Sequence, residues 1–313
     1  MYFSSDAGGR FHIWRQRFPD GTPQQVTSGA TEEEGIVMAS DGRSFITSVG
    51  LKQSIIMLHD ANGERPVSSV SHAASPQFVA DGKYIFYLVG PREAQEHQFV
   101  SGELYRADLQ SGNTEHLLPG VSVGGYAVSP NGRRIVYSAA DAQGHNHLWT
   151  TDLDLRSSPR QYPSSTDEDQ PSLDDTGNVY FRAAEGGSNF LYRMKQDGSD
   201  RTKLFPNPIL EFHGVSPDGR WALVYQSPSV QTDGLELVAV PLAGGTSVTI
   251  CAYECFAMWG NHGKGLAVQL YMKGGKNKTI LVPVPSDSPL PLPPGGVQPV
   301  RRPSDHKGRE DHG

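Results

Sequence analysis

Short runs of β-branched, aromatic and leucine residues recur along the chain, and turn residues such as Gly, Pro, Asp and Asn separate them. Runs of this kind are typical of β-strands. No stretch shows the 3.6-residue spacing of apolar positions that marks an amphipathic helix. The clearest runs lie at residues 45–49, 84–89, 135–138, 179–181, 222–225 and 266–270. The pattern therefore predicts an all-β chain.

A similar turn precedes each of these runs, and its best copies are close to Ser-Pro-Asp-Gly-Arg. Pro presets φ at the first central position, Asp or Asn accepts hydrogen bonds from its own backbone, and Gly takes a positive φ. Because the turn recurs from repeat to repeat, we assign its residues a structural role and not a catalytic one. These residues are Asp41, Gly42, Asp81, Gly82, Asn131, Gly132, Asp218 and Gly219.

The turn glycines lie at positions 42, 82, 132, 177, 219 and 263, so the repeat is about 44 residues long. Each full repeat contains four short runs, and four-stranded antiparallel sheets arranged around an axis are the blades of a β-propeller. Residues 1–28 supply the last three strands of one blade, and residues 251–284 supply the first three of another. We therefore predict a β-propeller of seven units with incomplete terminal blades. Six blades are the alternative if the two ends combine.

The character of the chain changes at its C-terminal end. Residues 285–296 are rich in Pro, and residues 301–313 are almost wholly polar. Such a segment buries too little apolar surface to become ordered. We predict a propeller over residues 1–286, a disordered tail over 287–313, and an exposed loop at the insertion 91–101.

Composition and charge exclude several classes of partner. The formal net charge is −7, so the chain presents no general basic face for a nucleic acid. No run approaches the roughly 20 apolar residues of a membrane span. We expect no nucleic-acid partner, no membrane span in this chain, no cofactor and a monomeric state. Cys251 and Cys255 are expected to be half-buried free thiols, with a local disulfide as the alternative.

Acidic residues recur eight to ten positions before the turn glycines, in the loops that enter the innermost strands. In a propeller these loops meet at one mouth of the central channel. One interpretation is an acidic funnel that binds a cation or a basic peptide. The other is a set of solvated acids on polar loops. The candidate binding residues at this mouth are Glu33, Glu34, His72, Glu168, Asp169, Glu211 and Glu254.

Motifs for catalysis and for metal binding are missing from the sequence. The segment Gly214–Gly219 comes closest to a Gly-x-Ser-x-Gly elbow, but Asp218 occupies the place of the last glycine. There is no phosphate-binding loop and no dinucleotide fingerprint. The pair His145 and His147 has no third ligand nearby, so no metal site is predicted. We therefore predict that the chain is not an enzyme.

The repeated turn, the β run after it, the Leu-led third strand and the final Leu/Val-Thr strand resemble the TolB-like, WD-repeat-like propellers over residues 1–284. The stretch from Trp14 to Ile36 is similar to propeller regions that follow the kinase domain of bacterial serine/threonine protein kinases. The resemblance implies a non-catalytic binding or scaffold role, as a protein- or peptide-binding sensor module of a larger bacterial protein. It also implies a periplasmic or extracytoplasmic location. Fold analogy alone does not decide function.

Two enzyme hypotheses stay open. The chain is the gating propeller of a prolyl-oligopeptidase-type peptidase if a hydrolase domain lies outside these residues. Alternatively, it is a propeller hydrolase or lyase that uses carboxylates such as Glu34 and Glu168 as an acid/base pair. The second hypothesis requires the two carboxylates to lie within catalytic distance of each other.

Overall fold

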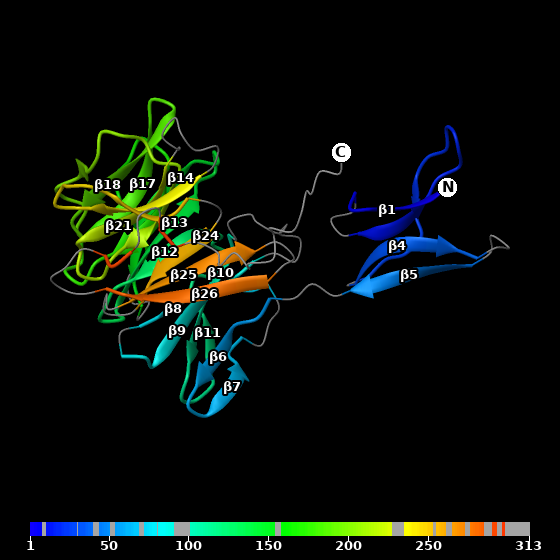
Figure 1. The fold of residues 1–313 in the computed structure, drawn as a ribbon, viewed down its shortest axis with the longest axis horizontal. Helices are drawn as coiled ribbons and strands as arrows, with labels where there is room; N and C mark the ends of the chain where they lie inside the picture. The colour runs from blue at the N-terminus through cyan, green and yellow to red at the C-terminus, as the bar shows by residue number, and fades with distance from the viewer. Residues whose placement is uncertain are drawn as a thin grey trace, which may run out of the picture.

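Antiparallel sheets built from consecutive strands make up the regular structure of the protein, which is seen here in a computed structural model (Figure 1). Among the described residues, none lies in a helix long and apolar enough to cross a membrane. The structure describes residues 1–7, 11–29, 31–39, 44–50, 54–68, 72–79, 81–90, 101–153, 158–226, 235–252, 255–260, 265–272, 276–284, 290–292 and 296–297. The predicted loop 91–101 therefore lies almost wholly outside the described residues.

Four of the sheets contain four strands in chain order, as expected for propeller blades. The first is β8 (Ala73–Phe78), β9 (Tyr84–Val89), β10 (Glu103–Asp108) and β11 (Thr114–His116), and the second is β12 (Val123–Val128), β13 (Arg134–Ala140), β14 (Asn146–Asp152) and β15 (Arg160–Gln161). The third is β16 (Glu168–Leu173), β17 (Val179–Glu185), β18 (Ser188–Met194) and β19 (Thr202–Lys203), and the fourth is β20 (Glu211–Val215), β21 (Trp221–Gln226), β22 (Glu236–Pro241) and β23 (Val248–Cys251). The first strands β12, β16 and β20 contact one another in succession, so they lie nearest the axis.

The two ends of the propeller are three-stranded sheets, as the sequence predicts. The N-terminal sheet contains β1 (Tyr2–Ser5), β2 (His12–Arg15) and β3 (Gln24–Gln25). The C-terminal sheet contains β24 (Cys255–Trp259), β25 (Gly265–Met272) and β26 (Lys276–Pro283). The all-β propeller prediction is therefore confirmed for the architecture, and the number of blades in a closed ring stays a prediction.

The second repeat differs from the expected four-stranded blade, because it forms two separate hairpins. These are β4 (Glu32–Met38) with β5 (Phe45–Gly50), and β6 (Met57–Asp60) with β7 (Gly63–Pro66). The first hairpin stays with the N-terminal sheet, where the Tyr2 and Phe45 rings lie 5.7 Å apart. The second packs on the blade that follows, through Ile56 in a core with Tyr87. Figure 1 shows β1–β5 together on one side, apart from β6–β26.

The repeated turn keeps one geometry in its three best-described copies, Asp81-Gly82, Asn131-Gly132 and Asp218-Gly219. Their glycines have φ of 68°, 67° and 68°, a region that L-residues rarely adopt. The residue before each glycine accepts a hydrogen bond from the backbone N–H two positions further on, at 2.9 to 3.1 Å. Asp41 and Gly42 lie outside the described residues. The turn residues thus set the crossing from the first to the second strand of each blade.

The core lies between neighbouring blades and not within one sheet. Four positions after the turn glycine, Phe86, Val136 and Leu223 are each fully buried against the blade that follows. The same interfaces bury Tyr137 and Phe181. Each blade therefore depends on its neighbour for the burial of one face.

Cys251 and Cys255 form a disulfide, with Cα atoms 6.6 Å apart, so the expectation of free thiols is wrong and the alternative holds. The bond joins the end of β23 to the start of β24. Both side chains lie in the core between the last two blades, which brings the two sulfur atoms together in a place that water does not reach.

Part of the tail that we predicted to be disordered is packed instead. Leu290 and Val297 are buried in the core of the last two blades, and Leu292 packs against it. The Val297 N–H donates to the carbonyl of Ile250 at 2.7 Å. We call residues 290–292 and 296–297 the tail strap. Gly296 and Val297 lie beside β23, and Leu290 and Leu292 pack on the same core. The sequence analysis underestimated the apolar surface that these few residues bury, and the rest of segment 285–313 lies outside the described residues.

Two leucines at the start of the same strand region test the blade-to-blade core. Leu237 is fully buried and Leu235 is half exposed. Replacing Leu237 by Ala is expected to lower the free energy of unfolding by about 2–5 kcal/mol, because a cavity is left between two blades. Replacing Leu235 by Ala should change it by less than about 0.5 kcal/mol. Urea unfolding measures the free energy of unfolding of both variants. An equal loss in the two variants would contradict the packing of Leu237 between two blades.

Candidate functional site

The candidate acids lie at the starts of first strands, where the chain enters β4, β16 and β20. The described members are Glu33, Glu168, Asp169 and Glu211. The side chain of Glu34 and the whole of Glu254 lie outside the described residues. The backbone partners of the first strands place these acids opposite the second strand of their own blade, for example Glu33 opposite Val49 and Glu168 opposite Ala183.

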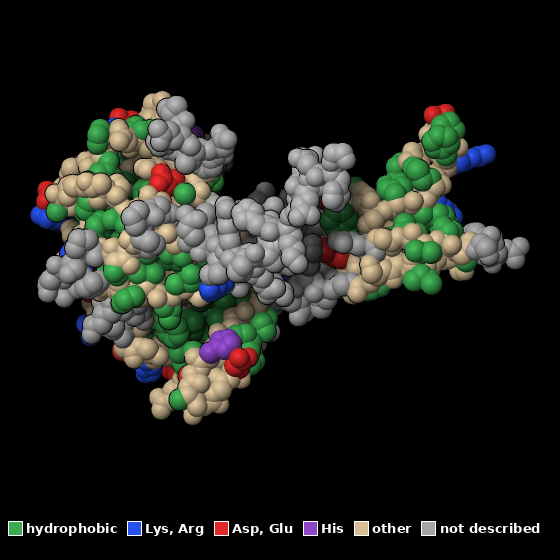
Figure 2. Space-filling model, viewed as in Figure 1, with side chains coloured by type: hydrophobic (Ala, Val, Ile, Leu, Met, Phe, Trp, Pro, Cys, Tyr) green, Lys and Arg blue, Asp and Glu red, His purple; other side chains and the backbone are tan. Residues whose placement is uncertain are grey.

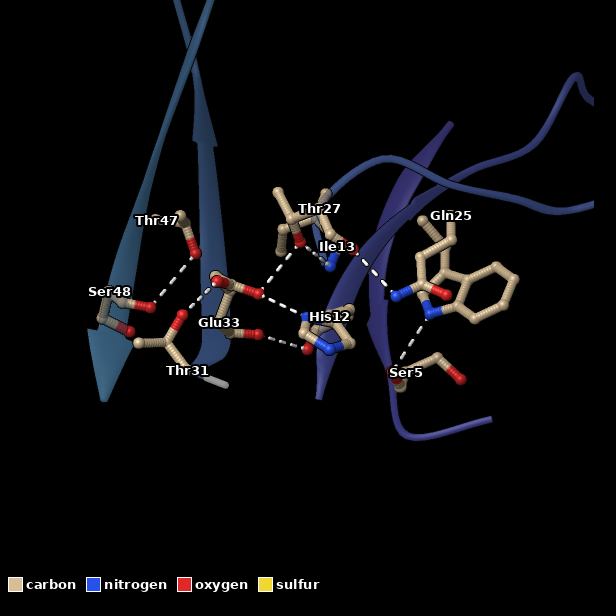
Figure 3. A network of polar contacts seen from close by, with 11 residues as sticks. Ser5, His12, Ile13, Gln25, Thr27, Thr31, Glu33, Thr47 and Ser48 are labelled. Carbon is tan, nitrogen blue, oxygen red and sulfur yellow. Dashed lines mark hydrogen bonds and ion pairs between the residues drawn. The ribbon is translucent and has the colours of Figure 1, made fainter. Parts of the chain in front are cut away.

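Glu33 is buried inside a network of hydrogen bonds that joins β2 to β4 (Figure 3). His12 Nδ1 lies 2.7 Å from Glu33 Oε2, and Thr27 Oγ1 donates to the same oxygen at 2.9 Å. Thr31 Oγ1 donates to the other oxygen, Oε1, at 3.0 Å. Ser4 Oγ donates to the Glu33 carbonyl at 2.9 Å. Every one of these groups belongs to β1–β5 or to the loops within it, so Glu33 fastens β4 to the N-terminal sheet.

Two opposing effects set the pKa of the Glu33 carboxyl. Burial raises this pKa, while the hydrogen bonds from His12, Thr27 and Thr31 lower it, and the result lies below the ordinary value of 4.5. The folded protein therefore holds Glu33 in its ionised form at neutral pH. The sequence analysis offered two interpretations of Glu33, an acid exposed at the channel mouth and a solvated acid on a polar loop. The buried position of Glu33 differs from both.

Glu168 has a similar position in its blade and a different partner. The residue is only 1% exposed, and its side chain forms an ion pair with Arg201. The guanidinium of Arg201 lies over the rings of Phe181, at 4.8 Å, and Tyr192, at 5.2 Å. Among the described residues no hydrogen bond of ordinary geometry reaches either carboxylate oxygen. The pair is thus a buried electrostatic contact on the face that β16–β19 turns toward β12–β15.

Asp169 faces the other way, toward the blade β20–β23. Arg182 donates two hydrogen bonds to its carboxylate, at 2.7 and 2.5 Å. Another nitrogen of Arg182 donates to the carbonyl of Leu210, which precedes β20. The neighbouring Asp169 raises the pKa of Arg182, so the guanidinium is held in its charged form. One arginine therefore ties the second strand of one blade to the first strand of the next.

Glu211 and His213 continue this line of contacts around the axis. His213 Nε2 lies 3.2 Å from Glu211 Oε2, and this hydrogen bond lowers the pKa of Glu211 more than burial raises it. The imidazole ring of His213 also packs edge-on against Tyr225 at 5.0 Å and Phe256 at 5.2 Å. The pair lies between the last two blades.

The histidines of the sequence analysis do not converge on a metal. His145 is paired with Asp167 and His147 with Asp141, each at 3.1 Å. His72 has a positive φ of 68°, and its carbonyl accepts a hydrogen bond from Gly90 at 3.0 Å. Within the described ranges, no three side chains of His, Cys, Asp or Glu are arranged to hold a metal ion.

The groups that neutralise the candidate acids were missed by the sequence analysis. Arg182 lies directly opposite Asp169 in the pairing of β16 with β17. The strand register, which follows from the position of the turn, could therefore have predicted this ion pair. His12 and Arg201 come from distant segments and carry no periodic pattern. The role of the candidate acids in binding stays a prediction, but each described one already has a partner in its own chain.

Comparison with known proteins identifies the type of propeller. The structure is similar to TolB from Acinetobacter baumannii, with a TM-score of 0.53 and 15% identity over 90% of this chain and 60% of that chain. The chain has a TolB-like β-propeller fold. No family model matches it.

Two propeller enzymes show the same degree of similarity. Oligogalacturonate lyase from Vibrio parahaemolyticus has a TM-score of 0.54 and 12% identity, over 91% of this chain and 86% of that one. Puromycin hydrolase has a TM-score of 0.52 and 14% identity, over 90% of this chain and 50% of that one. This chain thus spans half the length of puromycin hydrolase and 60% of that TolB. At these identities the likeness concerns the fold alone.

The network around Glu33 predicts a pH-dependent stability of the N-terminal strands. Because the folded pKa lies below the unfolded value, ionised Glu33 stabilises the fold above about pH 4.5, and this contribution is lost as the pH falls through the folded pKa. Glu33→Gln should therefore cost about 1.5–3 kcal/mol at pH 7 and less at pH 3, which lies below the unfolded pKa. Hydrogen-exchange protection of the β2 and β4 amides measures this difference.

The exposed Asp20, in the turn between β2 and β3, provides the control. Asp20→Asn should leave the protection of β4 unchanged at both pH values. An equal loss of protection in Glu33→Gln at pH 7 and pH 3 would show that the carboxylate charge is not what holds β4.

The buried pair of Glu168 and Arg201 predicts strong coupling between two substitutions. Arg201→Met keeps the contact with the two rings but leaves the buried carboxylate without its cation, which should cost about 3–5 kcal/mol. Adding Glu168→Leu should restore most of this loss, since no charge is then buried. Urea unfolding gives the free energy of unfolding of the unchanged protein, the two single variants and the double variant, which together form a double-mutant cycle. Additive losses in the double variant would contradict the ion pair.

Proposed function

We propose that this chain is a non-catalytic binding module that takes an extended peptide segment of a protein partner. The observation that carries the proposal is the tail strap, which already occupies such a position within the chain. Gly296 forms an antiparallel bridge with Cys251, and the Val297 N–H donates to the carbonyl of Ile250. The outer edge of β23 thus accepts an extended segment by adding it to the sheet.

Edge addition of this kind is a common mode of peptide recognition. Main-chain hydrogen bonds supply the affinity, and apolar side chains that alternate along the peptide supply the selectivity. Leu290 and Val297 of the strap enter the core between the last two blades, which also contains Ile250. The site would therefore prefer a segment with two spaced aliphatic side chains and a glycine.

The glycine requirement follows from the close approach of two backbones. A Cβ atom at Gly296 would lie 2.3 Å from the carbonyl oxygen of Ile250, and its φ of 76° disfavours other residues as well. A side chain at this place would separate the segment from β23. Substitution of Gly296 is thus a specific way to release the strap without changing a residue of the blades.

The candidate acids support a binding role more than an acid/base role. Glu33 is held by hydrogen bonds with His12 and two threonines, and Glu168 by its ion pair with Arg201. Glu168 was one member of the acid/base pair in the enzyme hypothesis, and its carboxylate is turned into the interface with the preceding blade. A general acid or base must reach the substrate proton, which this position does not favour.

An enzyme is the second candidate function, because oligogalacturonate lyase and puromycin hydrolase have similar propellers. A gating propeller of a peptidase would need a hydrolase domain outside these residues. We also propose that the chain is a sensor part of a larger bacterial protein, such as a serine/threonine kinase, with an extracytoplasmic location. These proposals rest on the sequence resemblance of residues 14–36.

Peptide binding to the full chain tests the proposed function. The probe is a fluorescent peptide with the sequence of residues 287–300, which contains the strap. In the unchanged protein the strap blocks the edge of β23 at high effective concentration, so the probe should bind weakly. Gly296→Ala should release the strap and raise the apparent affinity at least about tenfold. Fluorescence anisotropy gives both affinities.

Two controls make the outcome decisive. Gly265→Ala adds a methyl group 3.9 Å from the nearest atom, the carbonyl oxygen of Val282, and should leave probe binding unchanged. A scrambled probe should not bind either protein. Equal or absent binding by Gly296→Ala and the unchanged chain would contradict the proposal, and cleavage of the probe, seen by mass spectrometry, would favour the enzyme alternative.

A further inference from the structure

The N-terminal sheet carries a pocket at the end where its strands meet the turn between β2 and β3. The volume of this pocket is about 570 Å³, and small-molecule sites commonly have roughly 300–1,000 Å³. Tyr2 pairs with Arg15 across β1 and β2, and Arg15 pairs with Gln24 across β2 and β3. Because cross-strand partners lie on the same face of a sheet, these three side chains form a row, and all three line the pocket.

The turn after β2 adds a second arginine to the same pocket. The Gly21 N–H donates to the Arg17 carbonyl at 2.8 Å, and Gln16 Nε2 donates to the Gly21 carbonyl at 2.7 Å. A Cβ atom at position 21 would lie 2.7 Å from both the Cβ atom and the carbonyl oxygen of Arg17. The turn therefore closes this tightly because residue 21 has no side chain. Its closure places Arg17 in the lining together with Arg15.

The positive charge at this pocket is not neutralised by a carboxylate of the described residues. Other arginines form ion pairs with Asp or Glu, namely Arg65, Arg106, Arg134, Arg182, Arg201 and Arg220. The lining of the pocket contains Arg15 and Arg17 but no acid, and the exposed Asp20 of the same turn lies outside it. Figure 2 shows basic side chains, in blue, at the surface of the N-terminal strands. Two guanidinium groups at one opening repel each other, and a bound anion removes that repulsion.

Carbonyl groups at the pocket already accept hydrogen bonds from the chain itself. Arg15 Nη2 donates to Gln24 Oε1 at 3.1 Å, and the carbonyls of Arg17 and Gly21 accept the hydrogen bonds that close the turn. Donors remain, because a guanidinium has five N–H groups and a glutamine amide has two. The pocket thus offers the N–H groups of two arginines and of Gln24, together with the Thr22 hydroxyl. A ligand that matches it carries negative charge and accepts hydrogen bonds.

We propose that this pocket binds the phosphate monoester of a small molecule, at a site separate from the peptide site at β23. A phosphate ester carries a charge of about −1.5 to −2 at pH 7 and has three acceptor oxygens, which fits two guanidinium groups. The planar fork of arginine binds two such oxygens at once. A molecule of liquid water takes about 30 Å³, so a pocket of about 570 Å³ also holds an organic group. The half-buried ring of Tyr2 supplies an apolar wall for that group.

Calorimetric titration of the full chain at low, constant ionic strength tests the site, with phenyl phosphate and inorganic phosphate as the probes. Phenyl phosphate should bind saturably, with one molecule per chain, and more tightly than inorganic phosphate, since only the ester reaches Tyr2. Arg15→Met and Arg17→Met should each weaken its binding at least about tenfold, because each removes charged hydrogen-bond donors. Absence of saturable binding would overturn the proposal, and so would equal affinity for the two probes.

Two further variants separate a built pocket from a general effect of charge. Arg65→Met removes one positive charge from the exposed strand β7, where Arg65 pairs with Asp60, and should leave the affinity unchanged. Gly21→Ala keeps both arginines, but its Cβ atom would displace Arg17, so phenyl phosphate should bind more weakly. An equal loss of affinity in Arg65→Met, or no loss in Gly21→Ala, would indicate a diffuse basic surface and overturn the proposal.

Hydrogen exchange on the unchanged chain locates the ligand without any substitution. Binding stabilises the elements that form the site, so saturating phenyl phosphate should slow the exchange of amides in β1–β3. The amides of β12–β15 form the control and should exchange at the same rate with and without the ligand. Slowing of β12–β15 alone, or equal slowing of both sheets, would place the ligand elsewhere and contradict the proposed pocket.

Discussion

Packing of one blade on the next is the interaction on which the rest of this structure depends. The repeat places a turn glycine, and four residues later a side chain such as Val136 or Leu223 that only a neighbouring blade can bury. Burial of apolar surface is the main favourable contribution to folding. A blade without a neighbour therefore loses this contribution from one whole face. On β4–β5 and on β24–β26 such a face is exposed among the described residues, as Ile46 and Leu281 show.

Charged groups in the propeller act at the same interfaces. Glu168 with Arg201, and Asp169 with Arg182, lie on opposite faces of one blade. A buried charge is costly unless it is paired, and each of these acids meets its partner within its own blade, Asp169 on the adjacent strand β17 and Glu168 through Arg201 just before β19. The acids at the starts of the first strands thus help to fix how one blade packs on the next. Their spacing in the sequence also led to the hypothesis of a binding site at the channel mouth.

Much of the architecture follows from the repeat alone, because the turn chemistry and strand alternation recur with one period. The same pattern cannot distinguish a closed blade from the two hairpins β4–β5 and β6–β7, since the strands have the same sequence character in both. It also cannot orient Glu33, whose partner His12 lies in another repeat. The disulfide and the tail strap depend on contacts of single residues, such as Gly296 against Ile250, and such contacts leave no periodic signal.

Small-angle X-ray scattering of the full chain tests the central claim, that each blade needs a neighbouring blade to bury its apolar face. A compact single domain of this length has a radius of gyration of about 20 Å, and the account predicts a value near this with a single maximum in the distance distribution. A radius more than about a quarter larger, with a second maximum from a separate N-terminal lobe, would contradict it.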